Sequence, residues 1–258
     1  MATFLFDELI FGPVKSRRLG VSLGINLLPT DNKYCTFNCV YCECGWTDIE
    51  GKKIVLPKRE EFKQKLEAKL IKLRGTDNEP DAITFAGNGE PTIHPDFAAI
   101  IDDTIEARDK YAPKAKISVL SNASQLHKKR VKDALKRVDK NIQKLDAGSN
   151  DMFQLINQPL GNLSLNQIVD KLLAFDGKLI IQTLFIRGNY KGNRIDNTTD
   201  EEISAWLELV KRVNPMYVMI YPIDRDTPTQ DLMKIPAAEL DSIAQKVRDA
   251  GIKAEVYY

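Results

Sequence analysis

Short apolar segments alternate with longer segments of helical periodicity along most of this chain, and this order restricts the fold more than any other feature of the sequence. The apolar segments, each short enough for a buried strand, cover residues 19–27, 81–85, 116–120, 140–145, 179–186 and 217–221. The helical segments cover residues 58–74, 96–111, 125–137, 165–175, 200–213 and 237–250. Because parallel strands are usually connected by helices, the alternation predicts an α/β fold with a mostly parallel sheet.

Six strand–helix units are fewer than the eight of a closed βα barrel. We therefore expect a partial, open six-unit βα barrel, with a doubly wound sheet as the alternative. Gly251 is placed to cap the last helix, and residues 252–258 are expected to add a terminal strand. Because the chain has no linker, repeat or low-complexity tract, residues 1–258 are interpreted as a single domain. In either fold the chemistry should lie at the carboxyl ends of the strands.

The charge and hydropathy of the chain argue against some classes of function. The 37 basic and 36 acidic residues leave a net charge of +1, which gives no overall electrostatic reason to bind a polyanion. No secretory signal is visible at the N-terminus, and no apolar run approaches the roughly 18 residues of a membrane span. The expectation is a cytoplasmic protein that does not enter a membrane.

All four cysteines lie between Cys35 and Cys44, which excludes disulfides between distant parts of the chain. Cys35, Cys39 and Cys42 are separated by three and then by two residues. Thiolates at this spacing can hold three corners of a cubane [4Fe–4S] cluster, and one iron then has no protein ligand. The alternative is a zinc site on all four cysteines, although Cys44 follows Cys42 too closely for two ligands of one tetrahedral ion.

A Cys-x3-Cys-x2-Cys motif with an aromatic residue before its last cysteine resembles the signature of the radical S-adenosylmethionine (SAM) superfamily. The resemblance implies that Cys35, Cys39 and Cys42 bind a [4Fe–4S] cluster whose open iron is chelated by the amino and carboxylate groups of SAM. It also implies reductive cleavage of SAM to methionine and a 5′-deoxyadenosyl radical, with the backbone of Tyr41 against the adenine. The cofactor would supply the chemistry, while the protein positions it within a loop at about residues 34–45.

Further segments resemble a branch of Fe–S oxidoreductases related to the wyosine-base synthases. They are residues 11–20, 23–26, 87–92, 144–148 and 181–185, so the likeness extends through most of the chain. Wyosine synthases carry additional cysteines for a second cluster. Here only Cys44 is left over, which rules out a second all-cysteine cluster. Cys44 has no assigned role, and a free thiol beside the cluster loop is its simplest interpretation.

The turn after the second predicted strand is the next candidate part of the site. By the same resemblance, Asn88, Gly89 and Glu90 bind the amino group of SAM. Glycines let a backbone approach a ligand closely, and the Glu90 carboxylate can accept hydrogen bonds from an ammonium group. Without the cysteine motif, the turn could equally be a tight connection between strand and helix.

Polar residues at the ends of the third and fourth predicted strands extend the candidate site. Ser121 and Asn122 could bond the ribose or carboxylate of SAM, or cap the following helix. Lys144 and Asp146 lie where related enzymes contact SAM, or they form a structural ion pair. Lys144 could also hold the SAM carboxylate or a substrate anion, and it is the one candidate for a catalytic role.

The last two predicted strands and the first turn add further candidates. Gln182, Thr183 and Tyr221 are expected to face the same cavity as ligands of SAM or substrate, with hydrogen bonding inside the core as the alternative. Arg17 and Arg18 either clamp a carboxylate or phosphate or form a solvated basic turn.

These features predict a radical SAM enzyme, an iron–sulfur oxidoreductase that abstracts hydrogen from an unidentified small molecule or modified biomolecule. A reductase, flavodoxin or ferredoxin is the expected electron donor. Within enzymes, the alternatives are a tRNA-base modifying enzyme resembling the wyosine synthases and an activase of a glycyl-radical enzyme. The non-enzymatic alternatives are a zinc-stabilised binding module and an electron carrier.

Overall fold

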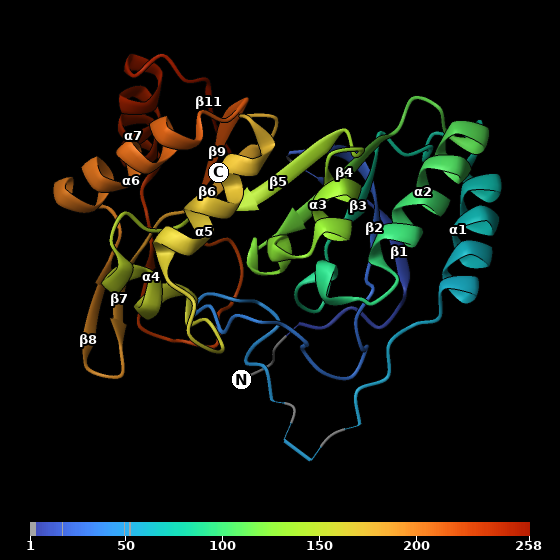
Figure 1. The fold of residues 1–258 in the computed structure, drawn as a ribbon, viewed down its shortest axis with the longest axis horizontal. Coiled ribbons are helices and arrows are strands. Elements are labelled where there is room, and N and C mark those ends of the chain that lie inside the picture. The colour runs from blue at the N-terminus through green and yellow to red at the C-terminus, as the bar shows by residue number, and fades with distance from the viewer. Residues whose placement is uncertain (1–3, 17, 49, 52) are drawn as a thin grey trace.

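The computed structural model describes residues 4–16, 18–48, 50–51 and 53–258. Within them, eight strands form one sheet in the order β1-β2-β3-β4-β5-β6-β9-β11 (Figure 1). The strands are β1 (Ile10–Ser16), β2 (Gly20–Ile25), β3 (Ala82–Phe85), β4 (Lys116–Ser121), β5 (Lys140–Lys144), β6 (Ile180–Leu184), β9 (Tyr217–Tyr221) and β11 (Ala254–Val256). β1 pairs antiparallel with β2, and the other neighbouring pairs are parallel.

The sheet curls without closing. In the described residues β1 and β11 form its two edges. Arg18, in the turn between β1 and β2, nevertheless lies with its guanidinium carbon 4.8 Å from the ring centre of Tyr221 on β9. Contact between positions so far apart in the strand order requires strong curvature. The fold is therefore the predicted α/β partial barrel, open between its first and last strands.

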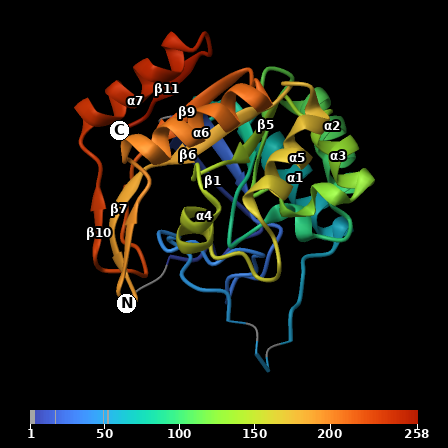
Figure 2. The same ribbon diagram turned by 60° about the vertical axis from the view of Figure 1, so that its left-hand side comes forward.

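Helices cover the outer face of the curved sheet (Figures 1 and 2). They are α1 (Arg59–Leu73), α2 (Phe97–Tyr111), α3 (Lys129–Leu135), α5 (Leu165–Leu172), α6 (Asp200–Val213) and α7 (Ala237–Asp249). Ile83 and Ile181 of the sheet belong to one large buried cluster with Phe62 of α1. Ile180, the neighbour of Ile181 on β6, belongs to a separate small cluster with Met219, because successive residues of a strand point to opposite faces.

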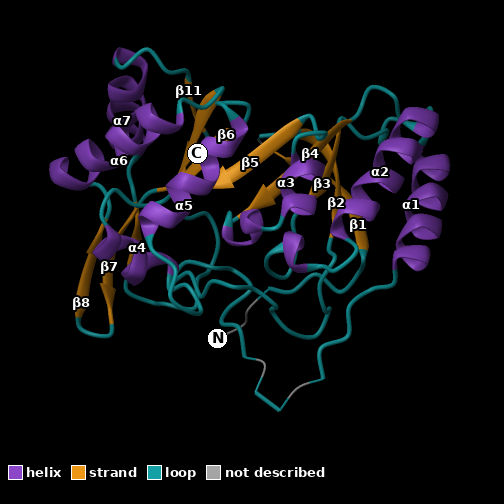
Figure 3. Ribbon diagram, in the orientation of Figure 1, coloured by secondary structure: helices purple, strands orange, loops and turns teal. Residues whose placement is uncertain are grey.

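Smaller elements lie near the carboxyl ends of the parallel strands. Helix α4 (Asn150–Asn157) precedes α5, and β7 (Ile186–Tyr190), β8 (Asn193–Asp196) and β10 (Leu232–Lys234) form a second sheet in the order β10-β7-β8. Short 3-10 turns are η1 (Pro91–Ile93), η2 (Ser124–His127) and η3 (Leu173–Phe175). Figure 3 shows the long N-terminal loops gathered at this same end of the sheet. In the described chain, no helix combines the length and apolar character that crossing a bilayer requires.

The six predicted strands and six predicted helices are all present, and the terminal strand is β11. Two helices are shorter than predicted, because η2 precedes Lys129 and η3 follows Leu172. The sequence did not predict β1, α4, β7, β8 or β10. Gly12 and Pro13 interrupt the strand pattern of β1, since proline cannot donate to a ladder. Helix α4 is only eight residues long and begins at a Ser149 cap, so its apolar periodicity is too brief to stand out.

An ion pair between α1 and α2 gives a prediction about stability and pH. Both oxygens of the buried Asp103 carboxylate accept hydrogen bonds from Arg59, at 2.7 and 2.9 Å. These bonds hold the pKa of Asp103 below its usual 3.8, so the pair stabilises the fold above that pH and stops doing so as the pH falls through the lowered pKa. We expect Asp103→Asn to lower the free energy of unfolding at neutral pH, by an amount that shrinks below about pH 4, as measured by urea denaturation.

Asp133→Asn is the matched control for this measurement. Asp133 pairs with Lys129 on an exposed part of α3, where an ion pair contributes little. A loss for Asp103→Asn that is as large in acid as at neutral pH would contradict the prediction.

Candidate active site

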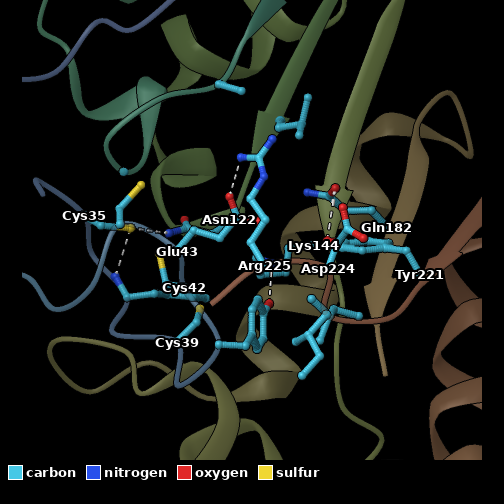
Figure 4. A pocket seen from close by; sticks show the side chains of 18 of the residues that line it. Cys35, Cys39, Cys42, Glu43, Asn122, Lys144, Gln182, Tyr221, Asp224 and Arg225 are labelled. Atoms are coloured by element: carbon cyan, nitrogen blue, oxygen red, sulfur yellow. Dashed lines mark hydrogen bonds and ion pairs between the residues drawn. The ribbon is translucent and has the colours of Figure 1, made fainter. Parts of the chain in front are cut away.

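A cavity of about 390 Å³ lies at the carboxyl ends of the parallel strands, a size within the usual range for small-molecule sites. Its walls come from the cysteine loop, residues 34–45, and from the ends of β3, β4, β5, β6 and β9. Eleven of the predicted site residues line it: Cys35, Cys39, Tyr41, Cys42, Gly89, Glu90, Ser121, Asn122, Lys144, Gln182 and Tyr221. Figure 4 shows the three cysteines on one side of the cavity, Gln182 and Tyr221 on the other, and Lys144 between them.

The cysteine loop is fixed to the turn after β3 by backbone pairing. The N–H of Tyr34 donates to Asn88 at 2.8 Å, and the N–H of Glu90 donates to Tyr34 at 3.3 Å. Gly89 lies between these bonds with a φ of +141°, and a Cβ there would meet the carbonyl oxygen of Tyr34 at 2.0 Å. Only glycine satisfies both conditions. Gly89 therefore allows the cysteine loop to pack against this turn, whatever ligand the cavity holds.

The positive charge of Lys33 acts on all three thiols of the cysteine motif. Burial raises the pKa of Cys35 to about 12 and raises that of Cys39, and the positive charge of Lys33 opposes both changes. A hydrogen bond from Cys44, followed by Lys33, lowers the pKa of Cys42 to about 5 against the effect of burial. Buried thiols of this kind ionise when a cation accompanies them, as a metal does.

This donor set fits an iron–sulfur cluster. In the described residues, no three metal-ligating side chains converge on the position of a single ion. The thiols of Cys35, Cys39 and Cys42 instead border one space, which is what three corners of a four-iron cubane require. The sulfur of the fourth cysteine, Cys44, lies 3.6 Å from the carbonyl oxygen of Gly87.

Glu90 joins the turn after β3 to the end of β4. One oxygen of its carboxylate accepts hydrogen bonds from the N–H and hydroxyl of Thr92, and the other accepts from the N–H of Asn122 at 2.6 Å. Burial raises the pKa of Glu90, and these bonds oppose the increase. The carboxylate is therefore held in one place at the cavity wall, where it can still accept from a ligand ammonium group.

Lys144, Tyr41 and Asp146 form a buried network under the cavity. Lys144 donates to the Tyr41 hydroxyl at 2.5 Å and lies 3.4 Å from Asp146, and Tyr41 donates to Asp146. Burial acts to lower the pKa of Lys144, but Asp146, Tyr221 and Cys39 together outweigh burial and the pKa is raised overall. Lys144 is thus held as a cation. It pairs with Asp146, and it also lines the cavity.

Three of the predicted residues are not among those that line the cavity. Asn88 exchanges hydrogen bonds with the backbone of Phe6 at 2.8 and 2.9 Å and donates to Pro29, so its side chain ties down the N-terminal segment. Asp146 lies behind Lys144, and the hydroxyl of Thr183 donates to Leu145 at 2.7 Å. For Thr183 the expectation of a cavity-facing side chain was wrong, because its neighbour Gln182 takes that face of β6.

The first turn also reaches the cavity, and two unpredicted residues lie beside the cysteines. Arg18 lines it, while Arg17 lies outside the described residues. Sequence reasoning missed Lys33, which is 3% exposed beside the cysteines, and Asn157, whose amide donates to Cys39 at 3.5 Å. The only sequence signal for Lys33 was a weak one: it lies two residues before Cys35 and so close to the cysteine motif. No local signal existed for Asn157, which is 118 residues away from Cys39 in the sequence.

The profile of the Radical SAM superfamily matches residues 31–175, a segment that contains the cysteine loop, the turn at Gly89 and Glu90, and strands β3 to β5. The chain belongs to the radical SAM superfamily. It is 31% identical over 241 residues to the UPF0026 protein MJ1312 of Methanocaldococcus jannaschii, covering 89% of this chain and 68% of that protein. It is also 29% identical over 254 residues to a Brachyspira hyodysenteriae protein named GTPase Obg, covering 96% of this chain. The chain spans 34% of the length of that second relative.

Solved radical SAM structures share the fold. A radical SAM methyltransferase from Sphaerobacter thermophilus matches with a TM-score of 0.69 and 15% identity, over 92% of this chain and 66% of that one. Archaeal TYW1 matches with a TM-score of 0.51 and 14% identity, over 88% of this chain and 71% of that one. At such identities the similarity shows the architecture alone, which is the open, mostly parallel barrel described above.

The network around Asp146 predicts a large effect of a small substitution. Asp146→Asn keeps the shape of the side chain but removes the charge that compensates the buried Lys144. Breaking a buried pair in this way costs about 3–5 kcal/mol, so we expect a loss of that order in the free energy of unfolding, measured by urea denaturation. Asp170→Asn, which breaks an exposed pair with Arg212, is the control. Equal losses in the two variants would rule out the structural role given to Asp146.

Proposed function

We propose that this chain is a radical SAM enzyme that binds a [4Fe–4S] cluster through Cys35, Cys39 and Cys42 and cleaves SAM reductively. The observation that carries the proposal is that these thiols and the Glu90 carboxylate border one cavity at the carboxyl ends of a radical SAM barrel. Three thiols leave one iron of a cubane without a protein ligand. The superfamily membership of the chain supports the same assignment.

When bound, such a cluster supplies an electron to the sulfonium of SAM, which divides into methionine and a 5′-deoxyadenosyl radical that takes a hydrogen atom from the substrate. Glu90 would accept hydrogen bonds from the SAM ammonium group, with its position fixed by Asn122 and Thr92. The Ser121 and Asn122 side chains would meet polar groups of SAM beside it. The backbone at Tyr41 would lie against the adenine, as the family resemblance implies.

The opposite wall of the cavity would bind the substrate. The Tyr221 hydroxyl donates to the side-chain oxygen of Gln182 at 3.5 Å, and Arg18 lies over the Tyr221 ring. Lys144, between the two walls, would bind the SAM carboxylate or an anionic group of the substrate. These groups would orient a polar substrate toward the cysteines, and an external reductase, flavodoxin or ferredoxin would supply the electrons.

Anaerobic reconstitution with iron and sulfide tests the proposal directly. We expect wild-type protein to bind about four irons and four sulfides, to absorb broadly near 400 nm, and to form 5′-deoxyadenosine from SAM under reducing conditions. Cys39→Ser should lose both the cluster and the cleavage, whereas Cys44→Ser should keep the cluster, because three cysteines suffice. Wild-type protein that takes up zinc but no iron and sulfide would instead support the zinc-stabilised binding module.

A second prediction concerns the recognition of SAM. Glu90→Gln replaces a carboxylate oxygen by an amide at the place proposed for the ammonium group. Because a hydrogen bond to a charged partner contributes about 1.5–3 kcal/mol, we expect SAM affinity to fall by about tenfold or more in equilibrium dialysis of the reconstituted protein. Glu43→Gln, which breaks an exposed pair with Arg225 at the same cavity, is the control. Unchanged affinity in a folded, cluster-containing Glu90→Gln protein would exclude Glu90 from this role.

A further inference from the structure

Each of the three thiols lies near a nitrogen-bearing side chain from outside the cysteine motif. We propose that Asn157, Asn122 and Lys33 set the reduction potential of the cluster: Asn157 and Asn122 donate hydrogen bonds to the sulfurs of Cys39 and Cys35, and Lys33 places its positive charge beside Cys42. The inference rests on the proposed function, because it assumes that these cysteines are the cluster ligands. It concerns residues that the cysteine motif does not include.

Asn157 has the most constrained geometry of the three side chains. It is 1% exposed at the end of α4, and its amide nitrogen lies 2.7 Å from Asp146 and 3.5 Å from the sulfur of Cys39. A carboxylate and a ligating thiolate can only accept, so the nitrogen must point toward them. The helix end is itself fixed to the cysteine loop, since the N–H of Val40 donates to Ile156 at 2.9 Å.

Asn122 holds the sulfur of Cys35 from the end of β4. Its amide nitrogen lies 3.6 Å from that sulfur and 3.0 Å from the hydroxyl of Thr36, and its backbone N–H is bound by Glu90. The backbone N–H of Phe37 adds a second donor to Cys35 at 3.4 Å. The side chain is therefore fixed at both ends and cannot turn away without losing several bonds.

Lys33 brings a full positive charge to the same group of sulfurs. It is 3% exposed, and its ammonium donates to the carbonyl oxygen of Gly45 at 2.8 Å. It lines the same cavity wall as the three cysteines, and among them Cys42 interacts most strongly with its charge. The charged groups that act most strongly on this ammonium are the thiols of Cys42, Cys35 and Cys39, so its charge faces the sulfurs.

The direction of the effect follows from electrostatics. A reduced cluster carries one more negative charge than an oxidised one, and part of that charge resides on the cysteine sulfurs. N–H donors and a buried cation stabilise the more negative state, and hydrogen bonds to the sulfurs are among the factors that set cluster potentials. The three side chains therefore raise the potential and make the cluster easier to reduce.

A redox titration of the reconstituted protein, followed by electron paramagnetic resonance, measures this effect apart from activity. We expect Asn157→Leu to shift the midpoint potential to more negative values, and Lys33→Met to shift it further, because it removes a charge. Gln154→Leu is the control on α4, since its amide donates to Leu163 and contacts no sulfur. Arg225→Met is the control for charge, since Arg225 is exposed and paired with Glu43, so its shift should be smaller.

The outcomes separate this inference from the proposed function. Wild-type protein that binds no cluster overturns the proposed function and the inference with it. Wild type and variants that carry equal clusters with equal midpoint potentials overturn the inference alone. If the variants fail to hold a cluster, resonance Raman spectra of the wild-type protein in H₂O and in D₂O test the proposal instead. Fe–S(Cys) bands that shift between the two solvents support hydrogen-bond donors on the sulfurs. Identical bands overturn the proposal.

Discussion

The carboxylate of Asp146 holds together the parts of the molecule that build the cavity. It is buried just after β5 and accepts hydrogen bonds from Tyr41 of the cysteine loop, from Asn157 at the end of α4 and from the backbone of Leu184 on β6. Lys144 balances its charge. A buried carboxylate is costly unless it is bonded and paired. The loop, the helix and the two strands therefore keep their relative positions, because a shift of any one of them would leave this group with an unmet partner.

The same physical rule governs the whole cavity wall. Burial disfavours the charged form of every ionisable group there, which raises the pKa of Cys35 and Glu90 and acts to lower that of Lys33 and Lys144. Both lysines nevertheless keep their charge, because acidic groups face them. Lys33 lies beside the cysteines and Lys144 lies near Cys39, so both positive charges are close to the place where a cluster would add negative charge. The site is thus arranged electrostatically for an anionic group bound to the loop.

Much of this could be predicted from the sequence, because the decisive signals are local. The strands and helices follow from apolar periodicity, and Cys35, Cys39 and Cys42 lie within eight residues of one another. The residues that were missed depend on contacts made only by the folded chain. Asn157 meets Cys39 across 118 positions, and nothing in the short helix that carries it indicates which side chain will face a sulfur. Neighbouring residues of a strand point to opposite faces, and this decides which predicted side chains reach the cavity. Gln182 faces the cavity, whereas Thr183 faces the core.

The open side of the barrel explains a role of β1, the strand that was not predicted from the sequence. Six parallel units leave a gap between the first and last strands, and such a gap would admit water to the inner face of the sheet. The hairpin of β1 and β2 brings Arg18 across this gap to the ring of Tyr221 and near Tyr257. An arginine can cover an aromatic ring and still present donors to a ligand. The gap is therefore spanned by the Arg18 side chain, which is also part of the wall proposed to meet the substrate.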